Sequence, residues 1–202
     1  PVITTALGKP IIPYEFESLL GSAARVASKP ANEALRVADL IMFVGSNYPF
    51  AEVMFSPNAK FIQIEADSKT LGKRHHTDVA ILADAPATLK KMIDRSDDAP
   101  RSGWYQANVD NVKNWHQYND DMMTRTTGKM RFEPVFGQIN RIATDDAIFA
   151  IDVGDVTQNA VRLLKVNGRQ AWTTSGLFAT MGAGLPAALA GQLSFPKRQV
   201  FN

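Results

Sequence analysis

The stretch LIMFVGSNYPF, residues 40–50, decides how the sequence around it is interpreted. Five apolar residues come first, and Gly45, Ser46 and Asn47 follow at once. A short apolar run that ends in turn-forming residues is typical of a buried strand in a parallel sheet. Ligands bind beyond the carboxyl ends of such strands. The three polar residues are therefore candidates for a ligand site, although Gly, Ser, Asn and Pro also build ordinary turns.

The segments around this run alternate between strand-like and helix-like patterns. Strands are predicted at residues 1–5, 40–45, 60–66 and 78–84, and helices at 29–38 and 85–95. Alternation of this kind predicts an α/β fold in which helices cover both faces of a parallel sheet. Polar and turn-forming residues at 96–103 then mark the edge of this domain.

The second half of the chain predicts another α/β domain. A helical stripe over residues 104–123 indicates a connecting helix, followed by strands in AIFAIDVG, QAWTTS and RQVFN and helices at 133–143, 156–165 and 183–192. We therefore predict a central domain at 1–97, a connecting helix and linker at 98–130, and a second domain at 131–202. We expect the chain to be a piece of a longer protein, because a chain that ends on a strand leaves backbone groups unpaired.

Composition narrows the class of partner. The chain has 202 residues, 45% of them hydrophobic, and a formal net charge of only +2 with both signs interspersed, so we expect no nucleic-acid partner. It contains no cysteine, which excludes thiolate metal sites and thiol nucleophiles and is compatible with the cytoplasmic location that we expect. Glycines and a proline interrupt the least polar run, residues 176–195, so no membrane span is predicted.

Other predicted strand ends also carry chemistry-bearing residues. Glu65 and Asp67 lie at the end of the strand predicted at 60–66, where a carboxylate suits a ribose hydroxyl, and the segment Ala83–Ala85 lies at the end of the next strand. Arg25 precedes a predicted helix and is placed to meet a diphosphate, whereas Lys29 is expected to be solvated. The alternative for these residues is a structural one, since Asp and Ser are common helix caps.

Several further patterns favour structural explanations. The adjacent histidines of GKRHH, residues 72–76, point apart and do not predict a metal site, and His116 is expected on a solvated helix face. Asp152 and Asp155 suit either Mg²⁺ or a capped helix start, of which capping is favoured. Residues 182–187, GAGLPA, match the dinucleotide fingerprint but follow no strand, so they predict a tight turn that opens a helix.

Four stretches carry a family resemblance: residues 29–53, 61–85, 151–164 and 177–202. They closely resemble the flavin-dependent pyruvate oxidases of the thiamine-diphosphate enzyme superfamily, and MGAGLPAA also recurs in its acetolactate synthases. The resemblance implies a pyrimidine-binding domain, a central FAD-binding domain and a thiamine-diphosphate-binding domain. This chain then holds most of the central domain and the start of the third. The Gly-Asp-Gly motif that holds Mg²⁺ is expected beyond Asn202.

The resemblance also implies a reaction. Pyruvate, phosphate and O₂ would yield acetyl phosphate, CO₂ and H₂O₂ with thiamine diphosphate, FAD and Mg²⁺ as cofactors, in a homotetramer. No catalytic residue is expected within this chain, which alone would be inactive. The first alternative is an acetolactate synthase or related decarboxylase with structural FAD. The second is a non-catalytic nucleotide-binding or assembly module.

Site residues follow from the resemblance position by position. Thiamine diphosphate would lie against Val153, Gly154 and Met181, although without the resemblance Met181 would be assigned to the core. The chain has Glu-Ala-Asp where relatives commonly have Asp-Ile-Asp, which leaves open whether Glu65 or Asp67 reaches the ribose. The residues implied for FAD are Ser22, Arg25, Gly45, Ser46, Asn47, Glu65, Asp67, Ala83, Asp84 and Ala85.

Overall fold

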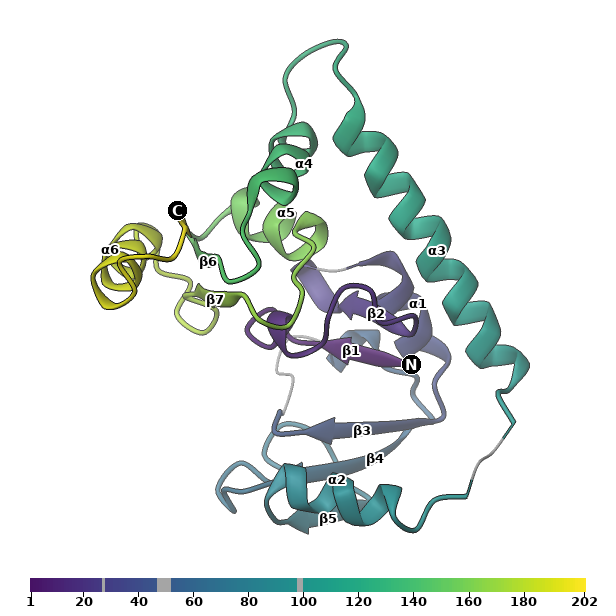
Figure 1. Cartoon of the computed structure of the whole chain (residues 1–202). Coiled ribbons are helices and arrows are strands. Elements are labelled where there is room, and N and C mark those ends of the chain that lie inside the picture. The colour runs from purple at the N-terminus through teal and green to yellow at the C-terminus, as the bar shows by residue number, and fades with distance from the viewer. Residues whose placement is uncertain (27, 47–51, 98–99) are drawn as a thin grey trace. The chain divides into compact units, whose positions relative to one another are not determined.

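The computed structural model describes residues 1–26, 28–46, 52–97 and 100–202 (Figure 1). These residues form two compact units, one made of Pro1–Ala31 with Gly103–Asn202 and the other of Asn32–Ser102. Every strand pair described is parallel, in sheets of two, three and three strands. The predicted α/β fold with parallel sheets is therefore confirmed.

The unit at 32–102 is built on a sheet with strand order β3-β4-β5. Its register keeps the strand ends in step, because Val44 lies opposite Ile64 and Ile64 opposite Ile81. Aromatic rings of Phe43, Phe55 and Phe61 pack together at centroid distances of 5.4 to 5.8 Å. The elements are β3 (Leu40–Val44), η3 (Glu52–Met54), β4 (Lys60–Glu65), β5 (Val79–Leu82) and α2 (Ala85–Ile93).

One face of β3 is buried and the other is not. Ile41 and Phe43 are buried, whereas Leu40, Met42 and Val44 are 38–55% exposed. This alternation is what period-two side-chain geometry gives when only one face of a strand is covered. The expectation that helices cover both faces is therefore wrong for the described residues of this unit.

The other unit contains two sheets. In the larger one, β6 lies between β7 and β8, all four residues of β6 are buried, and Phe149 and Ile151 pack against Ala160 and Leu163 of α5. The elements are β1 (Val2–Thr4), η1 (Lys9–Ile11), β2 (Leu19–Ser22), η2 (Ala24–Val26), α3 (Gly103–Thr124), α4 (Phe132–Ile142), β6 (Ile148–Ile151), α5 (Asp155–Leu163), β7 (Ala171–Thr174), α6 (Gly184–Ser194) and β8 (Val200–Phe201). Helix α1 (Lys29–Val37) crosses the boundary between the units.

Residues 1–31 are bound into this unit by contacts with its later elements. The N–H of Tyr14 donates to the Val166 carbonyl at 2.8 Å, and the Tyr14 ring stacks on His116 with centroids 4.2 Å apart. Strand β2, which the sequence did not predict, contacts both α3 and α5. The compact units thus follow a different division from the predicted domains, whose boundaries at residues 97 and 130 stay a prediction.

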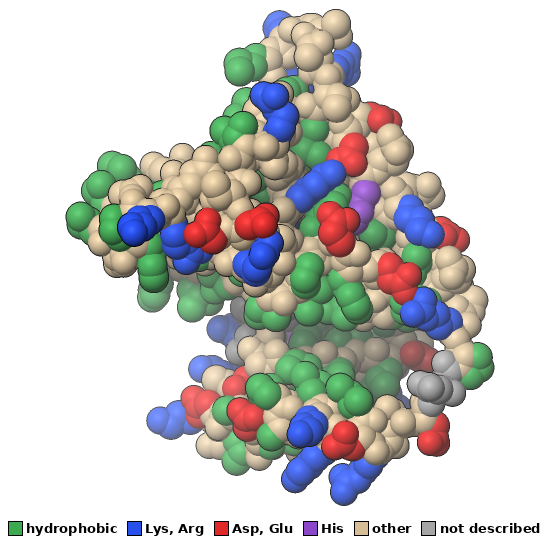
Figure 2. Space-filling view, in the orientation of Figure 1, with side chains coloured by type: hydrophobic (Ala, Val, Ile, Leu, Met, Phe, Trp, Pro, Cys, Tyr) green, Lys and Arg blue, Asp and Glu red, His purple; other side chains and the backbone are tan. Residues whose placement is uncertain are grey.

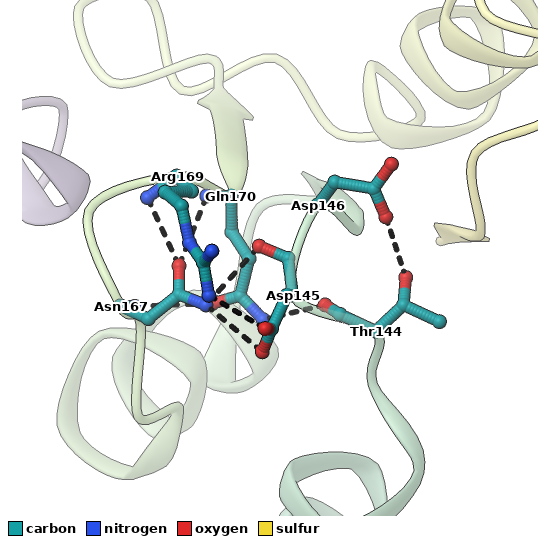
Figure 3. A network of polar contacts seen from close by, with 6 residues as sticks. All are labelled: Thr144, Asp145, Asp146, Asn167, Arg169 and Gln170. Atoms are coloured by element: carbon teal, nitrogen blue, oxygen red, sulfur yellow. Dashed lines mark hydrogen bonds and ion pairs between the residues drawn. The ribbon is translucent and has the colours of Figure 1, made fainter.

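Polar side chains close the amino-terminal end of β6 and β7 (Figure 3). Arg169 pairs with Asp145 at 2.5 Å, and the Gln170 amide donates to the Thr144 carbonyl at 2.9 Å. Asn167 adds a hydrogen bond from its amide to the Asp145 carbonyl at 3.1 Å. These contacts join the segments that precede the two strands. Ligands of parallel sheets bind at the opposite end, where the strands finish.

None of the helices that the structure describes combines the length and apolar character needed to cross a membrane. Figure 2 nevertheless shows hydrophobic side chains gathered over α6. They include Leu185, Leu189 and Leu193, which are 56%, 56% and 82% exposed.

Candidate cofactor-binding sites

Three of the predicted ligand loops meet at one edge of the β3-β4-β5 sheet. The N–H of Gly45 donates to the Ile64 carbonyl at 2.9 Å, and the N–H of Ala83 donates to the Glu65 carbonyl at 3.0 Å. Adjacent strands lie about 4.8 Å apart. The strand ends at Gly45, Glu65 and Ala83 are therefore immediate neighbours, as the sequence predicted.

Gly45 leaves open space at this edge. Its φ is +60°, a left-handed conformation that favours glycine, and a Cβ built on it would meet no described atom within 4 Å. The backbone is thus accessible to a flat ligand at close range. Ser46 follows it and is half-buried. Asn47, the third predicted residue of this loop, lies outside the described residues.

The two carboxylates at the end of β4, Glu65 and Asp67, both shape the loop that follows the strand. Glu65 Oε1 accepts a hydrogen bond from the Ala66 N–H at 2.9 Å, and Asp67 Oδ1 accepts one from the Lys69 N–H at 2.9 Å. The second oxygen of each carboxylate makes no hydrogen bond with the part of the chain that the structure describes. Ionised oxygens of this kind are strong acceptors for ribose hydroxyls, so both residues fit the predicted role.

Asp84 is the N-cap of α2. Its Oδ1 accepts a hydrogen bond from the Ala87 N–H at 2.9 Å, and its carbonyl accepts one from the Thr88 hydroxyl at 2.7 Å. Asp84 is therefore a helix cap, as the structural alternative predicted. Its neighbours Ala83 and Ala85 are half-buried and bring small side chains to the same strand end.

Gln63 is a residue of this edge that the sequence reasoning missed. It is 3% exposed on β4, and its Oε1 accepts a hydrogen bond from the Gly72 N–H at 2.7 Å. Its Nε2 donates to the Thr70 carbonyl at 3.4 Å. The glutamine thus ties the loop after β4 to the strand. A lone amide inside the apolar run KFIQIE was the clue, since buried polar groups are nearly always hydrogen-bonded.

The two histidines of the same loop make different contacts. The His75 ring stacks on Phe43 with centroids 5.3 Å apart, and His76 lies 3.8 Å from the Asp78 carboxylate. Among the residues that the structure describes, no group of three or more His, Asp or Glu is placed to hold a metal ion.

A second candidate site lies at the carboxyl end of β6. The predicted residues Val153 and Gly154 follow this strand directly, and Met181 lies in the loop between β7 and α6. Asp152 connects the two segments, because its Oδ1 accepts hydrogen bonds from the N–H groups of Val153 and Gly182 at 2.7 Å each. The hydrogen bond of its neighbour Gly182 therefore ties Met181 to the segment that carries Val153 and Gly154.

Met181 is presented to the outside rather than buried. Its side chain is 80% exposed, so the core-packing alternative is wrong. An exposed, polarisable side chain at the ligand end of a parallel sheet fits the support of an apolar ring.

The segment GAGLPA makes the tight turn that the sequence predicted, and α6 begins within it at Gly184. A Cβ on Gly184 would lie 3.0 Å from the Asp152 nitrogen, so a side chain there would collide with the strand end. Backbone N–H groups of Val153, Gly182 and Gly184 hold the Asp152 pKa below its usual range. The carboxylate thus accepts backbone hydrogen bonds, but the capping prediction is wrong for both aspartates: Gly154 is the N-cap of α5, which begins at Asp155, and Ala183 is the N-cap of α6.

Ser22 and Arg25 belong to the other unit from Gly45, Glu65 and Asp84, so the predicted FAD set is divided between the units. The Ser22 side chain is 3% exposed, with its hydroxyl 3.4 Å from that of Thr4. Arg25 is exposed.

Ser22 also lines a small cavity of about 30 Å³. Lys9, Tyr14 and His116 contribute to its wall. Burial lowers the pKa of Lys9 to about 7, and burial together with the nearby Lys165 lowers that of His116 to about 4. The solvated face predicted for His116 is therefore wrong, because its ring is stacked on Tyr14.

Comparison with known proteins gives two family matches. Residues 1–92 match the central domain of thiamine pyrophosphate enzymes, and residues 152–202 match their C-terminal TPP binding domain. Glu65 and Asp84 lie in the first match, and Asp152, Val153 and Met181 lie in the second.

Individual relatives cover the whole chain. A pyruvate oxidase of Lactiplantibacillus plantarum is 47% identical over 100% of the chain and 34% of its own length. A putative thiamine pyrophosphate-containing protein of Bacillus subtilis is 28% identical over 98% of the chain and 34% of its own length. The large subunit of acetolactate synthase isozyme 1 of Escherichia coli is 29% identical over 99% of the chain and 36% of its own length.

The chain thus spans about a third of the length of the curated relatives that it matches. The two domain matches follow one another in the order central domain, then C-terminal domain. Together the two domain matches cover more than half of the chain, which therefore belongs to the thiamine pyrophosphate enzymes.

Proposed function

We propose that the chain is part of a flavin-dependent pyruvate oxidase, which converts pyruvate, phosphate and O₂ into acetyl phosphate, CO₂ and H₂O₂. The observation that carries this proposal is the 47% identity to a pyruvate oxidase over the full chain, against 29% to the acetolactate synthase subunit. The placement of Met181 at the ligand end of β6, on a loop bonded to that strand, supports the thiamine-diphosphate part of it.

Thiamine diphosphate would be held by residues of the β6 end. Met181 would support its ring system with an exposed apolar side chain, and the backbone at Val153 and Gly154 would line the same side. Bound thiamine diphosphate supplies the electron sink for decarboxylation of a 2-oxo acid, and bound FAD accepts the two electrons of the oxidation. Within this site, the residues at the β6 end would orient the ring.

FAD would be held at the edge of the β3-β4-β5 sheet. Gly45 would let the backbone approach the flavin nucleotide, and the second oxygen of either Glu65 or Asp67 would accept a hydrogen bond from its ribose. Ala83, Asp84 and Ala85 would shape the adenine pocket, with Asp84 keeping its role as a helix cap. We include Ser22, Arg25, Ser46 and Asn47 in the same proposed set.

Further features of the whole protein belong to the same proposal. Its division follows the predicted domains, namely a central FAD domain at 1–97, a linker at 98–130 and the start of the thiamine-diphosphate domain at 131–202. Mg²⁺ would be held by residues outside this chain. The whole protein would be a cytoplasmic homotetramer.

An acetolactate synthase with structural FAD is the second candidate, since such enzymes also match the full chain at 26–30% identity. Product analysis separates the two. Full-length protein supplied with pyruvate, thiamine diphosphate, FAD, Mg²⁺ and phosphate in air should release H₂O₂ and acetyl phosphate. Acetolactate without oxygen uptake would instead identify a synthase, and nucleotide binding without any turnover would identify a non-catalytic module.

A further inference from the structure

Asp152 connects three segments at the carboxyl end of β6. It directly follows β6, and its Oδ1 accepts hydrogen bonds from Val153 in the same segment and from Gly182, thirty residues later. Its carbonyl accepts a hydrogen bond from the Thr157 hydroxyl of α5 at 2.6 Å. One residue thus binds the strand end, the first turn of α5 and the approach to α6.

The loop that carries Met181 has few other attachments. Its other hydrogen bonds among described residues are local: the N–H groups of Gly176, Ala179 and Thr180 donate to Thr174 or Ser175, and the Ala183 N–H donates to the Thr180 carbonyl. Leu177, Phe178 and Met181 are 73%, 90% and 80% exposed, so their side chains add little apolar packing, and the close approach of Leu7 is to Gly176 at the other end of the loop. The hydrogen bond from Gly182 to Asp152 is therefore the polar contact that fixes the Met181 end of the loop to β6.

The geometry leaves little room for another arrangement. Gly182 has a φ of +87°, and Gly184 packs so closely on Asp152 that a Cβ would lie 3.1 Å from the Asp152 Cβ. Hydrogen bonds from N–H groups to an ionised oxygen are roughly twice as strong as neutral ones. A carboxylate at this point can thus hold a loop that lacks a packed core.

We propose that Asp152 is a positioning residue for the thiamine ring: it fixes the Gly182 backbone at the end of β6 and thereby sets the place of Met181. This inference rests on the proposed function, in which Met181 supports the ring. Asp152 touches no cofactor in this account. Its effect on binding passes through the loop.

The test is thiamine-diphosphate affinity in the full-length protein, measured by titration in the presence of Mg²⁺. Asp152→Asn keeps the shape and one acceptor oxygen but loses the charge, and we expect its Kd to rise about threefold. Asp152→Ala removes the carboxylate that accepts the backbone hydrogen bonds, and we expect a rise of about tenfold or more, since a hydrogen bond to a charged group contributes on this scale. The graded order Asp, Asn, Ala is the expected result.

Asp145→Asn is the matched control. Asp145 also joins two segments of the same sheet, through Arg169, but at the opposite end (Figure 3). A merely structural role for Asp152 predicts that both Asn variants lower the apo-protein Tm and leave the Kd unchanged. The positioning role predicts a raised Kd for the Asp152 variant alone.

A double-mutant cycle with Met181→Ala tests whether the effect passes through the loop. If Asp152 acts by placing Met181, the double variant should lose less affinity than the product of the two single losses. Multiplicative losses would overturn the inference, as would an unchanged Kd in Asp152→Asn. If Asp152→Ala does not fold, the Asn variant and its cycle decide the question.

The wild-type titration separates this inference from the proposed function. Wild-type protein that binds no thiamine diphosphate contradicts the proposed function. If the wild-type protein and both Asp152 variants bind thiamine diphosphate equally well, only the positioning role is contradicted.

Discussion

The Lys9 ammonium donates a hydrogen bond to the Val161 carbonyl, 2.8 Å away and 152 residues later in the chain. Val161 lies in the last turn of α5, where carbonyls have no partner within the helix. The lysine therefore caps α5 from the N-terminal segment. It is buried, and its ammonium also lies 6.0 Å from the centre of the Trp172 ring.

This burial predicts a pH dependence of stability. The pKa of Lys9 is lowered from 10.5 to about 7, so between these values the unfolded chain binds more protons than the folded one. Stability should therefore rise from pH 7 to pH 10, by at most about 1.4 kcal/mol per pH unit. Lys9→Met should flatten the rise in denaturant titrations, while Lys113→Met, on the exposed face of α3, should leave it intact. An equal slope in Lys9→Met would contradict the assignment.

The lowered pKa of His116 predicts that stability also rises with pH on the acid side of neutrality. Its pKa is lowered from 6.5 to about 4, because burial and then the Lys165 and Lys9 charges outweigh the opposing effect of Asp120. As the pH falls through this window, the unfolded state takes up protons first and the fold loses stability. His116→Phe keeps a ring stacked on Tyr14 and should reduce the loss of Tm between pH 7 and pH 5. A variant as acid-sensitive as the wild type would argue against a neutral, half-buried imidazole.

Gln63→Met tests the loop after β4. The substitution nearly preserves volume but leaves the Gly72 N–H without its acceptor, so we expect a loss of about 1–3 kcal/mol in the free energy of unfolding. The Gly72 amide should also exchange its hydrogen faster, which reports local opening of the loop. Unchanged exchange at Gly72 would show that Gln63 does not hold it.

Gly45→Ala tests the open edge of the proposed FAD site. The left-handed backbone should cost about 1–2 kcal/mol of stability with any L side chain, and the new methyl group would occupy the space facing the ligand. Gly128→Ala is the control, because Gly128 also has a positive φ, +91°, and open space around its Cβ position. Full-length Gly45→Ala should retain less flavin per chain by absorbance, whereas Gly128→Ala should retain a normal amount.

Local periodicity predicted most helices and strands correctly because their patterns are self-contained. The apolar run at Leu40–Val44 and the spaced aromatics of α3 each indicate one element without reference to the rest of the chain. Strand β2, with the sequence LLGS, has only two apolar residues and a glycine, so its strand character comes from pairing with β1. That pairing is a tertiary effect that no window of sequence shows.

The sequence predicted the part of the candidate site that lies at the ends of strands. Gly45, Glu65 and Ala83 follow recognisable strands, so their meeting at one edge follows from parallel register. The roles of Lys9 and Asp152 depend on partners 152 and 30 residues away, Val161 and Gly182. A lysine in a loop and an aspartate at a strand end have many uses, and only the folded chain selects one.

The most direct test of the central claim is the phosphate dependence of oxygen uptake by the full-length protein with pyruvate, thiamine diphosphate, FAD and Mg²⁺. If the chain is part of a pyruvate oxidase, oxygen uptake should rise with phosphate concentration and one acetyl phosphate should form for each O₂ consumed. Pyruvate turnover that is indifferent to phosphate, with acetolactate as the product and no oxygen uptake, would contradict it.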